Sequence, residues 1–370
     1  MNARILLGIL LLNLPAGALE WKFKGQASAW AVAEFAHFDQ AQLGARYLPE
    51  MALRHPTQKL AIDAAASLNL TTAFRAETST AASSAQWYRA WLRVAADRWE
   101  ARLGLQKLDF GSALLLRPLM WFDSLDPRDP LQLTSGVTGA MARYVFLNNA
   151  NLRLWGLISA GKTKGLEIFP SPDGSPEFGG RLQYPTRRGE IAVTAHRRRV
   201  VPPDSPFFRH EPFGENRYAV DGKWDLGVGV WLEAALIRPQ QKVMTLGDQK
   251  LATVGVDYTF GVGNGLHALM EHMFIDFEID PLFGKNRRQF SGLLTNYNFS
   301  LWDQISAIFF YGHNERNLWQ FYMWRRTYDR WAFNVSVFNN PQSSAAFGLG
   351  SQSASAYRGR GVQIMVIYNH

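Results

Sequence analysis

The chain contains no cysteine among its 370 residues. Neither a disulfide framework nor a cysteine-ligated metal site can therefore form. Charged residues are also few, at 19% of the composition. No lysine- or arginine-rich tail of the kind that binds nucleic acid is present. Beyond the N-terminus, polar or charged residues interrupt each apolar run within about ten residues, which is too short for a membrane-spanning helix. These absences exclude a helical membrane protein and give no support to a nucleic-acid partner.

The longest apolar run stands at the start of the chain. Arg4 precedes the run from Ile5 to Leu14, and Ala16-Gly17-Ala18 follows it. A positive start, a short apolar core and a small-x-small site are typical of a cleaved secretory signal. The run has roughly half the apolar residues that a bilayer span needs, which argues against a retained helical anchor. We expect residues 1–18 to be a signal peptide and the mature chain to begin at Leu19.

Aromatic residues are abundant, at 13% of the composition, and they are spread along the whole chain. They accompany a period-two alternation of apolar and polar residues in segments of about ten residues, which is typical of membrane strands. The clearest segments begin at Trp21, Leu60, Tyr88, Trp99, Tyr218, Val228, Val254, Trp331 and Val362. Fainter segments lie near Tyr47, Arg143, Leu152, Phe178, Ile191, Leu269, Leu293, Ile305 and Trp319.

This pattern predicts one all-β domain over residues 19–370, a closed antiparallel transmembrane β-barrel of about 16–18 strands. A closed ring pairs every backbone donor and acceptor, as hydrocarbon requires. The alternative is a soluble all-β protein whose apolar faces meet in a core. Longer connections are expected at residues 111–134, 161–177 and 201–214, either as outer loops or folded into the lumen.

The segment from Glu100 to Asp129 combines an R-x-G-x-Q strand, an F-G pair and an aromatic, acidic loop. This segment resembles Gram-negative porin-like and alginate-export-type barrels, with the nearest likeness to barrels of Bacteroidetes-like bacteria. The resemblance implies a location in the outer membrane of a Gram-negative bacterium, among lipid and lipopolysaccharide. It also implies insertion by the barrel-assembly machinery through the C-terminal strand. That family closes on an aromatic residue, whereas here Asn369 and His370 follow Tyr368.

Charged residues on the predicted lumen face are mainly basic. The basic candidates are Lys22, Lys24, Arg89, Arg93, Arg98, Arg102, Arg181 and Arg217. The acidic candidates are Glu100, Asp221, Asp225, Glu233 and Asp257. A positive excess along a water-filled pore concentrates anionic solutes and lowers their entry barrier. The alternative is that these residues pair across strands and fill the lumen.

A second candidate lies in the loop that contains Trp121, Asp123, Asp126, Arg128 and Asp129. Aromatic and acidic side chains together could bind a sugar or a cation, or the loop could constrict the pore. Carboxylates in turns also simply cap the local backbone.

The run from His196 to Arg199 offers arginine forks that match the phosphates of lipopolysaccharide or an anionic solute. The alternative is a solvated strand end.

No arrangement in the sequence predicts catalysis or a metal. The G-x-S-x-G motif is absent. On a strand, His267 and His272 would face opposite sides, which argues against a zinc site. We therefore expect no enzyme activity and no cofactor.

The favoured function is an outer-membrane, porin-like channel for passive passage of small, anionic solutes. One alternative is an export channel for an anionic polysaccharide. Another is a plugged, non-conducting barrel that serves as an adhesin or anchor. A plug domain for energised uptake is not expected, because strands begin almost at Leu19. The oligomeric state is left open.

Overall fold

The computed structural model describes residues 19–57, 59–202, 211–241, 247–277, 286–341 and 357–370, and the expected signal peptide lies outside them. The first nine strands are β1 (Glu20–Glu34), β2 (His37–Pro56), β3 (Ala61–Arg75), β4 (Thr80–Ala95), β5 (Trp99–Gln106), β6 (Val137–Val145), β7 (Asn151–Ile158), β8 (Pro176–Thr186) and β9 (Gly189–Val200). The next nine are β10 (Phe213–Asp225), β11 (Gly229–Pro239), β12 (Gln249–Phe260), β13 (Leu266–Phe277), β14 (Asn286–Asn298), β15 (Asp303–Gly312), β16 (Asn317–Thr327), β17 (Trp331–Asn339) and β18 (Arg360–Asn369). Within these ranges no helix has the length and apolar character to cross a membrane.

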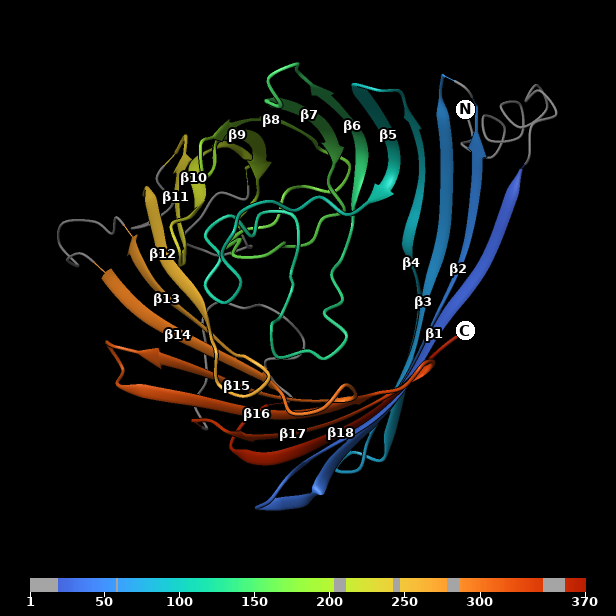
Figure 1. Ribbon diagram of the computed structural model, residues 1–370, viewed down its shortest axis with the longest axis vertical. Helices are drawn as coiled ribbons and strands as arrows, with labels where there is room; N and C mark the ends of the chain where they lie inside the picture. The colour runs from blue at the N-terminus through green and yellow to red at the C-terminus, as the bar shows by residue number, and fades with distance from the viewer. Residues whose placement is uncertain (1–18, 58, 203–210, 242–246, 278–285, 342–356) are drawn as a thin grey trace.

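The strands form one closed sheet (Figure 1). Each strand pairs antiparallel with its neighbours in sequence, and β1 completes the ring by pairing with both β2 and β18. The predicted closed antiparallel barrel is confirmed, with 18 strands at the upper end of the expected range.

The two ends of the barrel differ. One end, which we call the turn end, carries the start of β1, the end of β18 and short connections such as residues 96–98 and 187–188. The other end, which we call the loop end, carries the long connections 107–136 and 159–175. Beyond β18, the His370 backbone still pairs with Gly25, with both N–O distances at 3.0 Å. Such asymmetry is typical of outer-membrane barrels, whose short turns are periplasmic and whose longer loops are extracellular.

The outward faces of the strands are apolar. Exposed aromatic residues near the turn end are Trp21, Phe23, Trp99, Tyr144, Tyr184, Tyr258, Phe260 and Trp331. A second set lies nearer the loop end: Phe74, Phe178, Tyr218, Phe274 and Tyr311. Exposed aliphatic residues between them include Leu103, Leu154, Val193, Val254, Met270 and Ile364. Two aromatic girdles around an apolar band favour a lipid-facing wall over the soluble alternative.

Candidate functional site: the barrel lumen

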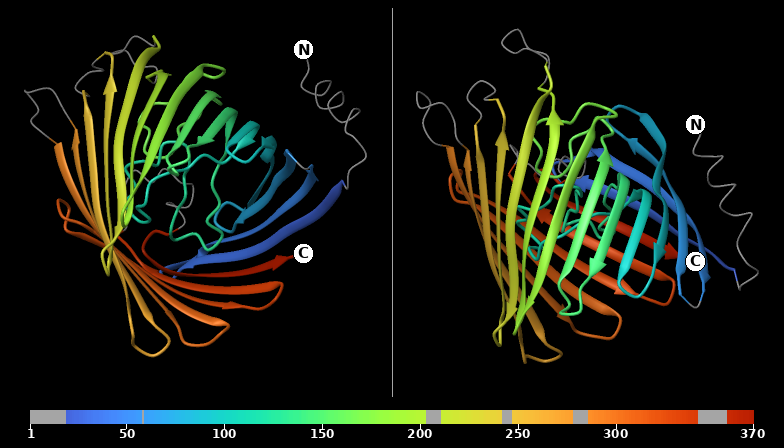
Figure 2. Two further views of the ribbon diagram at one scale, coloured as in Figure 1. Left: turned by 45° about the horizontal axis from the view of Figure 1, so that its top comes forward. Right: turned by 90° about the horizontal axis from the view of Figure 1, so that it is seen from above.

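The connection from residue 107 to residue 136, which we call the inner loop, lies inside the ring of strands (Figures 1 and 2). Its centre is as buried as a protein core: Leu115, Leu116, Leu119, Trp121 and Phe122 each expose at most 2% of their surface. The sequence predicted a long connection here and left open whether it would fold inward. The structure places it in the lumen.

Two carboxylates on the lumen wall hold the backbone of the inner loop. Glu271 on β13 accepts hydrogen bonds from the N–H groups of Leu114, Leu115 and Leu116, at 2.7, 2.9 and 2.6 Å. Glu233 on β11 accepts a further bond from Ala113 N–H at 2.7 Å. A buried carboxylate is costly unless donors surround it, and a buried N–H is costly without an acceptor. Each group therefore satisfies the other, and the loop is fixed against β11–β13.

Aromatic side chains continue this attachment along β7 and β9. Phe110 stacks on Trp155 with ring centroids 5.7 Å apart, and Phe122 meets the His196 ring edge-on at 4.9 Å. Trp155 also donates its indole N–H to His196 Nδ1 at 3.2 Å. The predicted ligand-binding aromatic Trp121 is 1% exposed and belongs to this core.

The charged residues of the inner loop mostly pair with one another. Arg128 contacts Asp126 through two bonds of 2.8 Å, and Asp123 binds Arg117 at 2.6 and 3.0 Å. Asp123, Asp126 and Arg128 are each at most 5% exposed. Backbone capping accompanies these pairs, since Asp126 also accepts from Arg128 N–H. This arrangement supports the capping interpretation for Asp123 and Asp126 and offers no open sugar site there.

Asp129 differs from its neighbours because it is only half-buried. Burial raises the pKa of its carboxyl above the usual value, while the N–H of Leu131 and the guanidinium of Arg46 on β2 lower it in part. Asp129 therefore brings a titratable negative charge toward the β2 side of the lumen.

A second connection, residues 159–175 between β7 and β8, joins a buried charge cluster on the wall. Its Glu167 binds Arg198 at 3.0 Å and Arg217 at 3.1 Å. Glu215 binds the same two arginines, at 2.7 and 2.8 Å. Arg217 was predicted to line the pore, but it is 1% exposed and paired on both sides. Its partners lie on its own strand and in the connection 159–175, so its charge is neutralised without a pair across strands.

Arg181 on β8 is likewise sequestered. Its guanidinium grips Asp221 on β10 through two bonds of 2.5 and 2.7 Å, and both side chains are buried. Two parallel bonds between a guanidinium and a carboxylate fix geometry as well as charge. Both residues were predicted to line the pore, yet their charges cancel within the wall.

We expect Arg181→Ala to lower barrel stability, because it leaves the Asp221 carboxylate buried and unpaired. The cost of breaking such a pair from one side is about 3–5 kcal/mol. Urea titration, followed by the mobility of the folded band on an unheated gel, measures this change. The double variant Arg181→Ala with Asp221→Ala should recover part of the loss, and a single variant as stable as the parent would contradict the assignment.

Four arginines on neighbouring strands form what we call the arginine wall: Arg93 on β4, Arg102 on β5, Arg143 on β6 and Arg153 on β7. They share the lumen face by register, since Arg93 faces Arg102 and Arg143 faces Arg153. Each of the four is partly exposed. Like charges directly opposite each other destabilise a sheet, so this arrangement needs a compensating anion or water.

Within the described ranges, two carboxylates form ion pairs with this wall. Arg93 binds Asp63 at 2.6 Å and Glu100 at 3.1 Å, and Arg102 shares Glu100 at 3.1 Å. In that same part of the chain, Arg143 and Arg153 form no ion pair; Arg153 contacts only the carbonyl of Asp109, at 3.5 Å. The wall therefore carries a positive excess toward the lumen.

Arg143 and Arg153 were not among the lumen residues predicted from the sequence. Strands were expected around both, but their alternation is short and Gly139 and Gly156 weaken it. A lumen assignment needed the register with β5, where Glu100 faces Arg143. That pairing is not visible in a single strand.

Other predicted lumen residues occupy varied positions. Lys22 and Lys24 lie on the lumen face of β1 near the turn end, where Lys24 binds Glu50 at 2.9 Å. Arg89 is buried and donates to the Thr134 carbonyl at 2.9 Å, so it holds the end of the inner loop. Asp257 faces the lumen near the turn end, beside Gly229.

One predicted lumen residue lies in a turn instead: Arg98 precedes β5 in an exposed turn, so this prediction extended the alternation one residue beyond the strand. Asp225 is the last residue of β10 and shares the lumen face with Gly229 and Asp257 by register. Its carboxylate accepts the N–H of Gly227 at 3.1 Å. Tyr88 breaks the pattern differently: it has no partner in β3 at a register shift, and its ring lies 4.0 Å from the Arg89 guanidinium.

The run from His196 to Arg199 divides between the two faces of β9. His196 and Arg198 are buried in the lumen, whereas Arg197 and Arg199 are exposed on the outer face. His267 and His272 also face opposite sides, and Glu271 beside them holds the inner loop. No group of three or more metal-ligating side chains occurs among the residues described.

Comparison with known proteins supports the architecture. No family model matches the sequence, and no curated protein matches it significantly. Among solved structures, Pseudomonas aeruginosa OccD3 (OpdP) matches with a TM-score of 0.62 at 9% identity, over 96% of this chain and 92% of that one. Acinetobacter baumannii OccAB4 matches with a TM-score of 0.59 at 10% identity, over 95% and 98%. The anion-selective porin from Comamonas acidovorans matches with a TM-score of 0.51 at 12% identity, over 95% and 100%.

At these identities the three likenesses show a shared fold. The chain is an all-β, closed 18-stranded barrel with the fold of outer-membrane porins.

Proposed function

We propose that the protein is a passive channel of the Gram-negative outer membrane for small solutes, with a preference for anions. The arginine wall is the observation that carries this proposal. Two of its four guanidiniums form ion pairs with two carboxylates, on β3 and β5. The other two arginines form no ion pair with a carboxylate in the described chain. Fixed positive charge on a low-dielectric wall raises the local concentration of anions and speeds their entry.

The inner loop adds a constraint on size. It is fixed to β11–β13 by Glu233 and Glu271, and Thr134 at its end contacts Arg89 on β4. In this proposal, solute passes between the inner loop and the lumen wall, close to the arginine wall. Narrowing brings an ion nearer to the charged side chains, and electrostatic selectivity grows as that distance falls.

The decisive experiment is single-channel recording of the refolded mature chain, Leu19 to His370, in a planar bilayer under a KCl gradient. Stable conductance steps with a chloride-leaning reversal potential are the expected result. A potassium-leaning potential from the same folded barrel would overturn the anion preference.

A second candidate, a closed barrel that serves as an anchor or adhesin, follows from the buried centre of the inner loop. It predicts a folded barrel that passes no ions.

The export channel for an anionic polysaccharide is a variant of the first proposal. Block of the chloride current by an anionic polymer such as alginate distinguishes this variant from a channel for small solutes. For each of these functions, we propose that the barrel-assembly machinery inserts the chain through its C-terminal strand.

Lowering the pH should strengthen the chloride preference. Because burial raises the pKa of Asp129, this carboxyl loses its charge at a higher pH than an ordinary aspartate and leaves Arg46 less compensated. Reversal potentials at neutral and mildly acidic pH measure the change. Asp129→Asn should raise the chloride preference at neutral pH and reduce its further rise on acidification. An unchanged pH profile in this variant would exclude Asp129 as the titrating group.

A further inference from the structure

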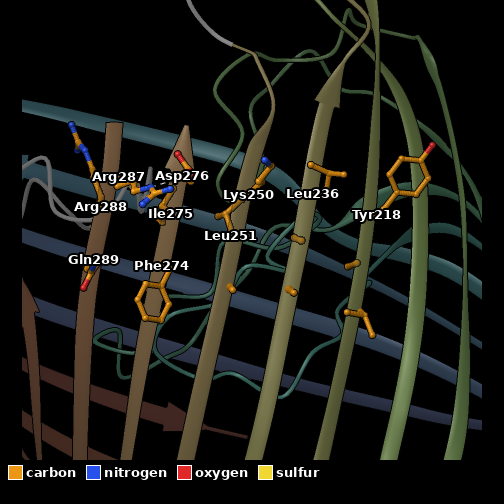
Figure 3. Close-up of a pocket in the computed structure, with 15 residues that line it drawn as sticks. Tyr218, Leu236, Lys250, Leu251, Phe274, Ile275, Asp276, Arg287, Arg288 and Gln289 are labelled. Carbon is orange, nitrogen blue, oxygen red and sulfur yellow. Dashed lines mark ion pairs between the residues drawn. The ribbon is translucent and has the colours of Figure 1, made fainter. Parts of the chain in front are cut away.

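The outer wall carries a groove near the loop end, across β10–β14 (Figure 3). Its volume is about 760 Å³. The small side chains of Ala234 and Ala252, which are register partners, line its floor. Tyr218 and Phe274 stand on either side (Figure 3). The same strands hold the inner loop through Glu233 and Glu271 on their opposite face, so the groove faces away from the lumen.

The groove changes from apolar to charged along the barrel. One row of register partners across the five strands is Val220, Ala234, Ala252, Phe274 and Gln289. The next row toward the loop end is Tyr218, Leu236, Lys250, Asp276 and Arg287. Lys250 is exposed, and Arg287 is 66% exposed while its Nε lies 3.5 Å from Asp276. An apolar trough thus ends at two cations and one carboxylate.

We propose that this groove binds one phosphorylated glycolipid of the outer leaflet, the lipid A part of lipopolysaccharide. An acyl chain would lie on Ala234 and Ala252 between the two aromatic rings. A phosphate would meet Lys250 and Arg287. Arginine offers a planar fork that matches phosphate oxygens, and lysine adds a mobile point charge. This binding is independent of the proposed channel activity.

The order of the two rows along the barrel, charged toward the loop end and apolar toward the middle, matches this ligand. In an outer-membrane barrel the loop end faces the cell exterior, so a lipid of that leaflet places its headgroup toward the loops and its acyl chains toward the barrel's middle. The groove has the same order, with cations above and alanines below. A protein partner would not require an apolar trough running down the membrane-facing wall.

A second groove of about 640 Å³ on the outer wall provides an internal comparison. It crosses β1–β4 and β17–β18, with Ala45 and Tyr47 among its lining residues. The one cation that lines it, Arg46, points to the lumen and binds Thr71 at 3.4 Å. It therefore offers similar apolar space without an outward cation.

The test uses the refolded barrel in detergent, with rough-type lipopolysaccharide as the probe and native mass spectrometry as the readout. The parent chain should retain one lipopolysaccharide per barrel. Removing both cations, Lys250→Ala with Arg287→Ala, should weaken binding about thirtyfold. Filling the floor of the groove with Ala252→Phe should abolish retention of lipopolysaccharide. Ala45→Phe, the same substitution in the second groove, should leave retention unchanged.

Each variant is first checked for the folded band on an unheated gel, so that loss of binding is measured only on intact barrels. Dephosphorylated lipid A should bind more weakly than the intact form. Equal retention of phosphatidylglycerol would overturn the choice of a glycolipid. The site itself would be overturned if lipopolysaccharide binding were unchanged both in Lys250→Ala with Arg287→Ala and in Ala252→Phe. A loss of binding in Ala45→Phe as large as that in Ala252→Phe would overturn it as well.

Discussion

Replacing Glu271 with alanine should release the inner loop and raise the unit conductance of the channel. Glu271 accepts hydrogen bonds from three backbone N–H groups, and the alanine side chain has no acceptor to replace the carboxylate. A buried donor left without a partner costs about 1–3 kcal/mol, so the undocked population should rise at least about a hundredfold. Single-channel recording under symmetric KCl measures the conductance, and larger current noise should accompany it.

The barrel itself should survive this change, because the strand ladders around β13 do not depend on the Glu271 side chain. Glu233→Ala removes the acceptor of only one loop N–H and should give a smaller rise. If Glu271→Ala conducts like the parent, the inner loop does not limit ion flow. If the parent is silent and Glu271→Ala conducts, the closed-barrel function gains support.

Glu271 also shows why the site could not be read from the sequence. Between two histidines on an alternating strand, it suggested at most a weak metal motif. Its partners are backbone groups more than 150 positions away in the chain, as the separation from Leu115 shows. Backbone donors carry no residue signature, so only the folded chain brings them together. The loop itself was predictable, because residues 111–134 lack alternation.

The strands were far easier to predict than the site. A lipid-facing wall forces every strand to alternate, and one residue of slip would place a charge in hydrocarbon. Errors arose where alternation continues past the end of a strand, as at Arg98, or where a register shift interrupts it, as at Tyr88. Lumen direction could be predicted for Arg181, but its pairing with Asp221 crosses from β8 to β10 and needed the register of the strand between them.

Reversing the charge of two arginines on the wall, Arg143→Glu with Arg153→Glu, should invert the ion preference. These two side chains have no carboxylate partner in the described chain, so their replacement breaks no ion pair. A charged pore wall changes the local concentration of an ion by 10-fold or more, and we expect the chloride-to-potassium permeability ratio to fall by about that factor. Reversal potentials under a KCl gradient give the ratio directly.

Arg360→Glu is the matched control, because Arg360 is exposed and its register places it on the outer face of β18. This variant makes the same kind of charge change without altering the lumen, so its reversal potential should equal that of the parent. High salt should shrink the difference between parent and wall variant, since screening shortens the reach of fixed charges. A wall variant with the parental potential at low salt would show that permeating ions do not pass the arginine wall. The anion preference would then have to come from Arg46 beside Asp129, which the response of Asp129→Asn to pH measures independently.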